Sequence, residues 1–123
     1  MPNPKVITWF DIPAEDINRA VGFYNNVLGM ALQVVDFNGI SMAMFSENPE
    51  ITSGAIVQTE YNSPSETGST VYFWVDDLDG TISKVEGFGG VILQPKTMIS
   101  EEHGFYSLIK DTEGNRVGLH GMS

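Results

Sequence analysis

The chain carries one plan of strand and helix twice, at an offset of 61 residues (from Gly29 to Gly90) within 123 residues. Residues 6–29 have the pattern of a strand, an acidic turn and a helix ended by glycine, and residues 69–90 have the same pattern. Three short strand-like runs follow each helix. A solenoid needs at least about three stacked units to bury its core. The repeat therefore predicts one pseudo-symmetric domain with a cleft where its two units meet.

The first unit, about residues 5–61, is expected to form one strand, one helix and three further strands. Apolar side chains recur at helical spacing, with Asp16 placed to cap the start of the helix and Gly29 to end its last turn. The dipeptide Asn38-Gly39 is a strong signal for a tight hairpin. The strands are expected at residues 6–10, 31–36, 40–45 and 54–59.

The second unit, about residues 69–121, repeats this order after a polar linker at residues 62–68. Its helix is expected at about residues 78–88, and Gly114 is expected to take a positive φ in a tight reversal. The strands are expected at residues 70–75, 91–94, 105–109 and 116–120. The sequence thus predicts a single α+β domain over residues 1–123, built of two βαβββ modules.

Composition excludes several classes of function. Sixteen acidic and six basic side chains give a net charge of −10, which would repel a phosphate backbone, so we expect no nucleic-acid partner. The charge either keeps the protein soluble or attracts a cationic ligand. The start, Met-Pro-Asn-Pro-Lys, has no apolar core of signal-peptide length, and no apolar run is long enough to span a membrane. With no cysteine in the chain, we expect a soluble, cytoplasmic protein.

Three segments carry a resemblance to a known family. They are residues 12–20 (Ile-Pro-Ala-Glu-Asp-Ile-Asn-Arg-Ala), residues 75–78 (Val-Asp-Asp-Leu) and residues 111–120 (Asp-Thr-Glu-Gly-Asn-Arg-Val-Gly-Leu-His). Together they resemble the glyoxalase, bleomycin-resistance and extradiol-dioxygenase superfamily, also called the vicinal oxygen chelate fold. The resemblance implies a mixed sheet curled around a concave cup, with helices on the convex side and, in the enzymes of the family, a divalent metal in the cup.

The positions of the family's metal ligands hold unsuitable residues here. When the family's ligand positions are matched one at a time to this sequence, they fall on Trp9, Gln58, Thr70 and Gly118. An indole has no lone pair to give and glycine has no side chain, so this set cannot hold Zn, Ni or Fe in the usual place. We therefore expect no metal and no other cofactor. The ending Gly-Leu-His at residues 118–120 resembles a metal-free, single-domain subgroup.

Strand alternation suggests which side chains would line the cup instead. Side chains two apart share one face of a strand, so Asp11 is expected beside Trp9, Tyr72 beside Thr70, and His120 on the strand of Gly118. A carboxylate close to an imidazole in a half-buried cavity is a suitable acid/base pair. Alternatively, Asp11 and His120 only satisfy each other or a backbone group. Gln58 is expected in the same cup as a ligand-binding residue.

Two functions of different classes follow. One is a metal-independent lyase or isomerase in which Asp11 or His120 moves a proton on a carbonyl-type substrate. The other is a non-catalytic protein that binds or sequesters a small molecule, as the bleomycin-resistance branch does. A metal enzyme with the unusual ligands Gln58, Glu60 and His120 is a third interpretation. Lys96 is either a partner for a ligand carboxylate or simply solvated. The resemblance also implies a homodimer.

Overall fold

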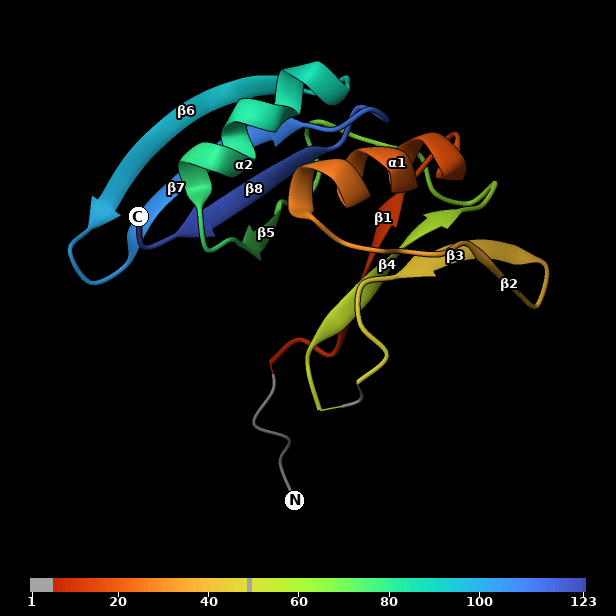
Figure 1. Cartoon of the computed structure of the whole chain (residues 1–123). Coiled ribbons are helices and arrows are strands. Elements are labelled where there is room, and N and C mark those ends of the chain that lie inside the picture. Colours follow the sequence, from red (N-terminus) through yellow and green to blue (C-terminus); the bar gives the residue numbers. More distant parts are fainter. Residues whose placement is uncertain (1–5, 49) are drawn as a thin grey trace.

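Two four-stranded sheets, each with a helix packed against one face, make up the computed structural model, which describes residues 6–48 and 50–123 (Figure 1). Residues 1–5 lie outside the described residues, and with them Lys5, where the first module was expected to begin. The elements are β1 Trp9–Pro13, α1 Ile17–Leu28, β2 Val35–Phe37, β3 Ile40–Met44, β4 Ser53–Gln58, β5 Val71–Trp74, α2 Leu78–Val85, the 3-10 turn η1 Glu86–Phe88, β6 Val91–Ser100, β7 Gly104–Lys110 and β8 Arg116–Gly121.

The two sheets share one topology. Their strand orders are β1-β4-β3-β2 and β5-β8-β7-β6. In each sheet the first and last strands of the module are parallel, and the remaining pairs are antiparallel. The predicted α+β class and the two βαβββ modules are therefore confirmed. None of the helices in the described part of the chain is long and apolar enough to cross a membrane.

Both helices begin, and α1 ends, where the capping residues predict, whereas α2 ends at Val85 and the 3-10 turn η1 completes the expected span to Phe88. The Asp16 carboxylate accepts a hydrogen bond from the Arg19 backbone N–H at 3.1 Å, and Asp77 accepts one from Gly80 N–H at 3.0 Å in the second module. Gly29 ends α1 in the left-handed region at φ 66°. The Asn38-Gly39 turn has positive φ at both residues, as the tightest hairpins require.

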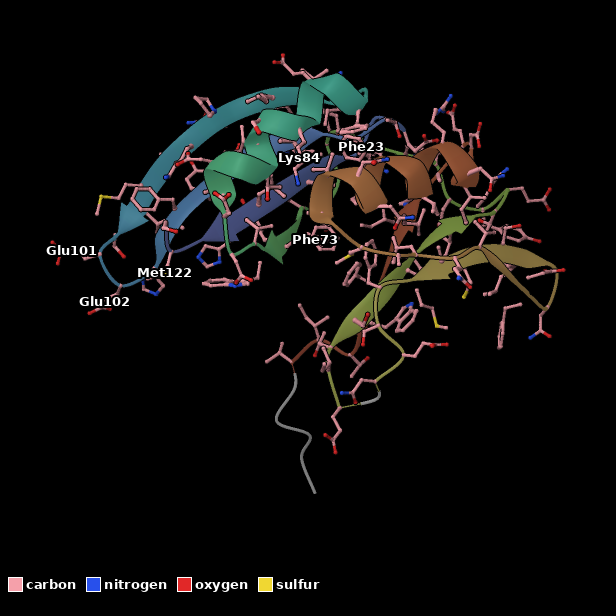
Figure 2. The ribbon with its side chains drawn as sticks, in the orientation of Figure 1. Phe23, Phe73, Lys84, Glu101, Glu102 and Met122 are labelled. Carbon is pink, nitrogen blue, oxygen red and sulfur yellow. The ribbon has the colours of Figure 1, made fainter. Side chains whose placement is uncertain are left out.

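One apolar core lies between the helices and the sheets and joins the two modules. Phe45 of the first module and Phe73 of the second have ring centroids 4.9 Å apart, and Phe10 of β1 meets Phe73 edge-on at 6.1 Å. Phe23 lies where α1 meets α2 (Figure 2). Because the core is shared, the modules fix each other's position, and the opposite faces of the sheets are left without helices.

Three strands differ from the sequence-based expectation. The first was expected over residues 6–10, but β1 spans Trp9–Pro13, where it pairs with Ser53–Val57 of β4. A strand was expected over residues 31–36, but β2 begins only at Val35, because the Asn25 side chain binds both the N–H and the carbonyl of Leu32. A strand was expected to stop at Gln94, before Pro95, but β6 continues to Ser100. β6 is the edge strand of its sheet and its register shifts around Gln94, and proline is tolerated at such positions.

The loop Asp111–Asn115 ties the second module to the start of α1. The Glu113 carboxylate accepts hydrogen bonds from the backbone N–H groups of Glu15 and Asp16 at 2.9 and 2.8 Å, and pairs with the Arg19 guanidinium at 2.7 Å. The Asp111 carboxylate accepts a 2.6 Å hydrogen bond from the buried Tyr24 hydroxyl. The loop turns at Gly114 with φ 98°, as predicted.

Glu113 makes this junction sensitive to pH. Burial opposes ionisation of its carboxyl, but hydrogen bonds from the Arg19 side chain, the Asp16 backbone and the Thr112 hydroxyl outweigh it, and the pKa of Glu113 is lowered. The same contact raises the pKa of Arg19. A carboxyl whose pKa is lower in the folded state stabilises the fold above its unfolded pKa of about 4.3. That stabilisation is lost as the pH falls through the folded pKa.

We predict that Glu113→Gln lowers the free energy of unfolding by about 2 kcal/mol at pH 7. The substitution removes charge-assisted hydrogen bonds, and the Arg19 guanidinium loses the carboxylate that it pairs with. Urea titrations at pH 7 and at about pH 3 measure the effect, which should shrink at the lower pH. The matched control is Glu15→Gln, which neutralises an exposed carboxylate just before α1, on the other side of the same junction. A difference between wild type and Glu113→Gln that does not change with pH contradicts the assignment.

Candidate functional site

Each sheet has a bare face, which we define as the face opposite the helices. In β1, Ile12 is buried in the core while Trp9 and Asp11 are exposed on the other side. In the second sheet, Leu119 is fully buried toward the helices. Its alternate neighbours face away, and Tyr72 and Trp74 of β5 are 51% and 58% exposed. The bare faces thus carry large aromatic side chains that a monomer does not bury.

The bare face of the first sheet is mostly apolar. Asp11 pairs with Ala55 in the strand register, Ala55 with Met44, and Val57 with Met42, so these residues share one face. The register continues the same face across the sheet through Val35, Phe37 and Ile40. Flexible methionines beside exposed aromatic and branched side chains form a wall that adapts to the shape of an apolar partner.

The bare face of the second sheet combines aromatic and basic side chains. The Trp74 and His120 rings meet edge-on with centroids 5.3 Å apart. The register places Tyr106 beside His120, and Lys110 beside Arg116, on this same face. Sequence reasoning missed Arg116 as a site residue. The signal was present, because Arg116 lies two and four residues before Gly118 and His120 and so shares their side of β8.

Gly118, one of the expected metal-ligand positions, lies beneath the ring of Tyr72. A Cβ atom at residue 118 would overlap the ring carbons of Tyr72, which pairs with Gly118 across β5 and β8. The glycine is therefore what allows the aromatic ring to lie flat on the strand. Thr70, directly before β5, is half-buried and follows the same alternation as Tyr72.

The donor set does not fit a divalent metal. The Trp9 indole N–H donates to the Asp11 carboxylate at 3.0 Å and offers no lone pair, and residue 118 has no side chain. Gln58, the one residue of the set with an amide oxygen, already uses that oxygen elsewhere. Within residues 6–48 and 50–123, no three side chains among His, Asp and Glu cluster closely enough to hold a metal ion.

Gln58 lies on the helix side of its sheet, so the prediction that placed it in the cup with Trp9 is wrong. It follows the buried Ile56 by two positions and therefore shares the face that packs on the core. Its side-chain oxygen accepts a 2.8 Å hydrogen bond from the backbone N–H of Ile17, the first residue of α1. Gln58 thus helps to satisfy the start of a helix.

Lys96 also lies on the helix side, and its role as a partner for a ligand carboxylate stays a prediction. Its ammonium group pairs with Asp79 of α2 at 3.1 Å. It also lies 4.6 Å from the centre of the Phe105 ring, which packs against the core. The register shifts in β6 around Gln94 and Thr97 break the simple alternation that would have placed this side chain.

Asp11 and His120 both belong to bare faces, but each has a hydrogen-bond partner of its own. Asp11 accepts from the Trp9 indole, and His120 Nε2 lies 2.6 Å from the His103 carbonyl oxygen. A carbonyl only accepts, so Nε2 carries the proton and Nδ1 of the neutral ring keeps the lone pair. The structure shows no hydrogen bond between Asp11 and His120, so the direct pair that the sequence suggested is not formed.

Two depressions are lined by residues that the sequence analysis singled out, one by Asp11 and one by Gln58. A small cleft of about 50 Å³ between β1 and the starts of β5 and β8 is lined by Asp11, Ser69 and Arg116, among others. A larger open groove of about 810 Å³ lies at the hairpin turn Asn38-Gly39 and the segment 58–64, away from the expected metal position.

We predict that Gly118→Ala lowers the free energy of unfolding by about 2 kcal/mol, because the added methyl group overpacks against the Tyr72 ring. In the Tyr72→Ala background the same change should cost much less, since the two substitutions then act on one contact. Thermal and urea unfolding measure both. Gly22→Ala, in α1 with open space around its Cβ position, is the matched control and should be neutral or stabilising. Equal costs in both backgrounds contradict the contact.

A family model and two relatives identify the chain's family. The model of the Glyoxalase/Bleomycin resistance protein/Dioxygenase superfamily matches residues 6–119, so the chain belongs to this superfamily. A glyoxylase-like domain-containing protein of Didymella fabae is 30% identical over 112 residues, covering 89% of this chain and 88% of that protein. The anthracycline biosynthesis protein DnrV of Streptomyces peucetius is 28% identical over 78% of this chain, which spans only 40% of DnrV.

Solved structures of the family have the same fold. TnmS3, an antibiotic binding protein from Streptomyces sp. CB03234, aligns over the full length of both chains with a TM-score of 0.67 and 21% identity. The fosfomycin resistance protein FosX from Listeria monocytogenes aligns over 97% of this chain and 91% of its own, with a TM-score of 0.70 and 13% identity. At these identities the likeness concerns the fold.

Proposed function

We propose that this superfamily member binds a flat, largely apolar organic molecule against the bare faces of its sheets and holds it without chemical change. The observation that carries the proposal is the exposure of Trp9, Tyr72 and Trp74, at 44%, 51% and 58%, on the faces without helices. Large aromatic side chains that lie exposed together are more common at binding surfaces than on the rest of a protein's surface.

The named relatives support this class of ligand. One relative is an anthracycline biosynthesis protein and one structural neighbour is an antibiotic binding protein. An anthracycline contains fused, flat rings, which stack well on indole and phenol side chains. The tyrosine ring over Gly118 supports the same view, because it places a stacking surface where the enzymes of the superfamily hold a metal.

The contacts of the two candidate catalytic residues favour binding over turnover. A proton-transfer pair should have its two groups within hydrogen-bonding reach of each other or of a shared substrate atom. Here the Asp11 carboxylate is held by Trp9, and one nitrogen of His120 is held by the His103 carbonyl. The homodimer implied by family resemblance stays a prediction. The apolar side chains on the first sheet supply a surface that a second copy would bury.

We predict that an anthraquinone probe, 2-(hydroxymethyl)anthraquinone, quenches the fluorescence of wild-type protein, because both tryptophans of the chain lie on bare faces. Trp74→Ala should weaken binding about tenfold or more, since a stacking surface is lost, with Trp9 left as the reporter. Phe88→Ala is the matched control, because it removes an exposed aromatic ring outside the bare faces and should leave the affinity unchanged. Wild-type protein that shows no saturable quenching contradicts the proposal.

A metal-independent lyase or isomerase is the second candidate function, and one observation favours it. Because His120 Nε2 is fixed on the His103 carbonyl, Nδ1 is held as the unprotonated nitrogen, which is the form a general base needs. The ring is further oriented by its edge-on contact with Trp74. A carbonyl compound bound on the aromatic surface would then lie beside a proton acceptor.

If His120 is such a base, wild-type protein should exchange the proton next to the carbonyl of an α-hydroxy ketone for deuterium in D₂O. His120→Gln should then slow the exchange about 100-fold or more while leaving the affinity for the probe nearly unchanged. Proton NMR of the substrate measures the rate. An exchange rate in the presence of wild-type protein no higher than in buffer rejects this second function and leaves the binding function standing.

A further inference from the structure

Arg116 has a buried donor without an acceptor. Its Nε atom is shielded from solvent and makes no hydrogen bond, and no ion pair or side-chain hydrogen bond joins its guanidinium to another residue of the described chain. A buried donor is nearly always paired, so an orphaned one calls for an explanation. Its isolation is notable in a chain with sixteen acidic residues.

Three other cations in the described part of the chain have acidic partners. Arg19 pairs with Glu113, Lys96 with Asp79, and Lys110 lies 3.8 Å from Glu66. Arg116 lines the small cleft between β1 and the starts of β5 and β8, which Asp11 lines too, yet the two make no ion pair. The Arg116 guanidinium therefore lies at the junction of the two sheets without an acidic partner.

We propose that Arg116 anchors the ligand by binding an anionic oxygen, a carboxylate or phenolate, at this junction. Guanidinium offers five N–H donors and no acceptor, so it selects oxygen acceptors and rejects cations. The strand register supports this placement, because Arg116 shares the side of β8 that carries Gly118 and His120. The polar end of the ligand lies at Arg116, and its rings lie over Tyr72.

This inference rests on the proposed binding function and adds a chemical class to it. The ligand is an aromatic molecule with an acidic or phenolic oxygen at one end. The cleft at Arg116 has room for a few water molecules, one of which the ligand oxygen would replace while keeping its hydrogen bonds. The charge-assisted hydrogen bonds formed there fix the orientation of the rings.

The test compares two probes with the same ring system, anthraquinone-2-carboxylate and the neutral 2-(hydroxymethyl)anthraquinone. Wild-type protein should bind the carboxylate about tenfold more tightly, as measured by tryptophan quenching. Arg116→Met, which keeps the aliphatic stem, should lose that preference and bind both probes equally. Lys84→Met removes an exposed positive charge on α2 and should keep the preference, which controls for the change in net charge.

A second measurement separates ligand binding from a structural role. With no ligand, Arg116→Met should unfold at the same temperature as wild type or higher, because the substitution removes an unpaired buried donor. A lower unfolding temperature, or a carboxylate preference that survives in Arg116→Met, overturns the inference. Wild-type protein that binds both probes equally overturns it while leaving the proposed function intact. Wild-type protein that binds neither probe removes the proposed function itself, and this inference with it.

Discussion

The buried carboxylate of Glu113 determines how the two halves of the molecule sit together. It binds two backbone N–H groups at the entry to α1 and the Arg19 guanidinium, so the loop before β8 is fixed against the loop after β1. Asn115 in the same loop donates to the Pro13 carbonyl at the end of β1. These contacts bring the starts of β5 and β8 beside β1, and so place Asp11 and Arg116 on one cleft.

The fold could be predicted from the sequence where local chemistry decides the structure. The caps at Asp16 and Asp77 recur at the repeat offset because each helix needs an acceptor for its first N–H groups. The repeat is inexact after α2. There Gly89, which ends η1, takes the left-handed conformation that the match of Gly29 with Gly90 would have given to Gly90. The start of β2 could not be predicted, because it depends on the contact between Asn25 and Leu32.

The site could be predicted only as far as strand alternation reaches. Alternation placed Trp9, Asp11, Tyr72 and His120 on bare faces, because β1, β5 and β8 are regular. Alternation made no prediction for Lys96, which lies on the helix side in a part of β6 that carries register shifts. Gln58 was placed by counting along a family motif, whereas its parity with Ile56 points to the core side. A hydrogen bond between Asp11 and His120 depends on the distance between two sheets, which no single-strand pattern contains.

In the proposed function, stacking on aromatic rings replaces metal coordination, and this gives the remaining polar groups a role. A metal fixes a ligand through directional bonds, whereas an aromatic ring such as Tyr72 attracts many flat molecules and orients them weakly. Orientation must then come from hydrogen bonds at the edge of the stacking surface. Arg116 lies at such an edge with donors to spare, and His120 offers one free nitrogen on the same sheet. In the proposed binding function, the residues at the metal-ligand positions and the unpaired guanidinium would therefore act together on one ligand.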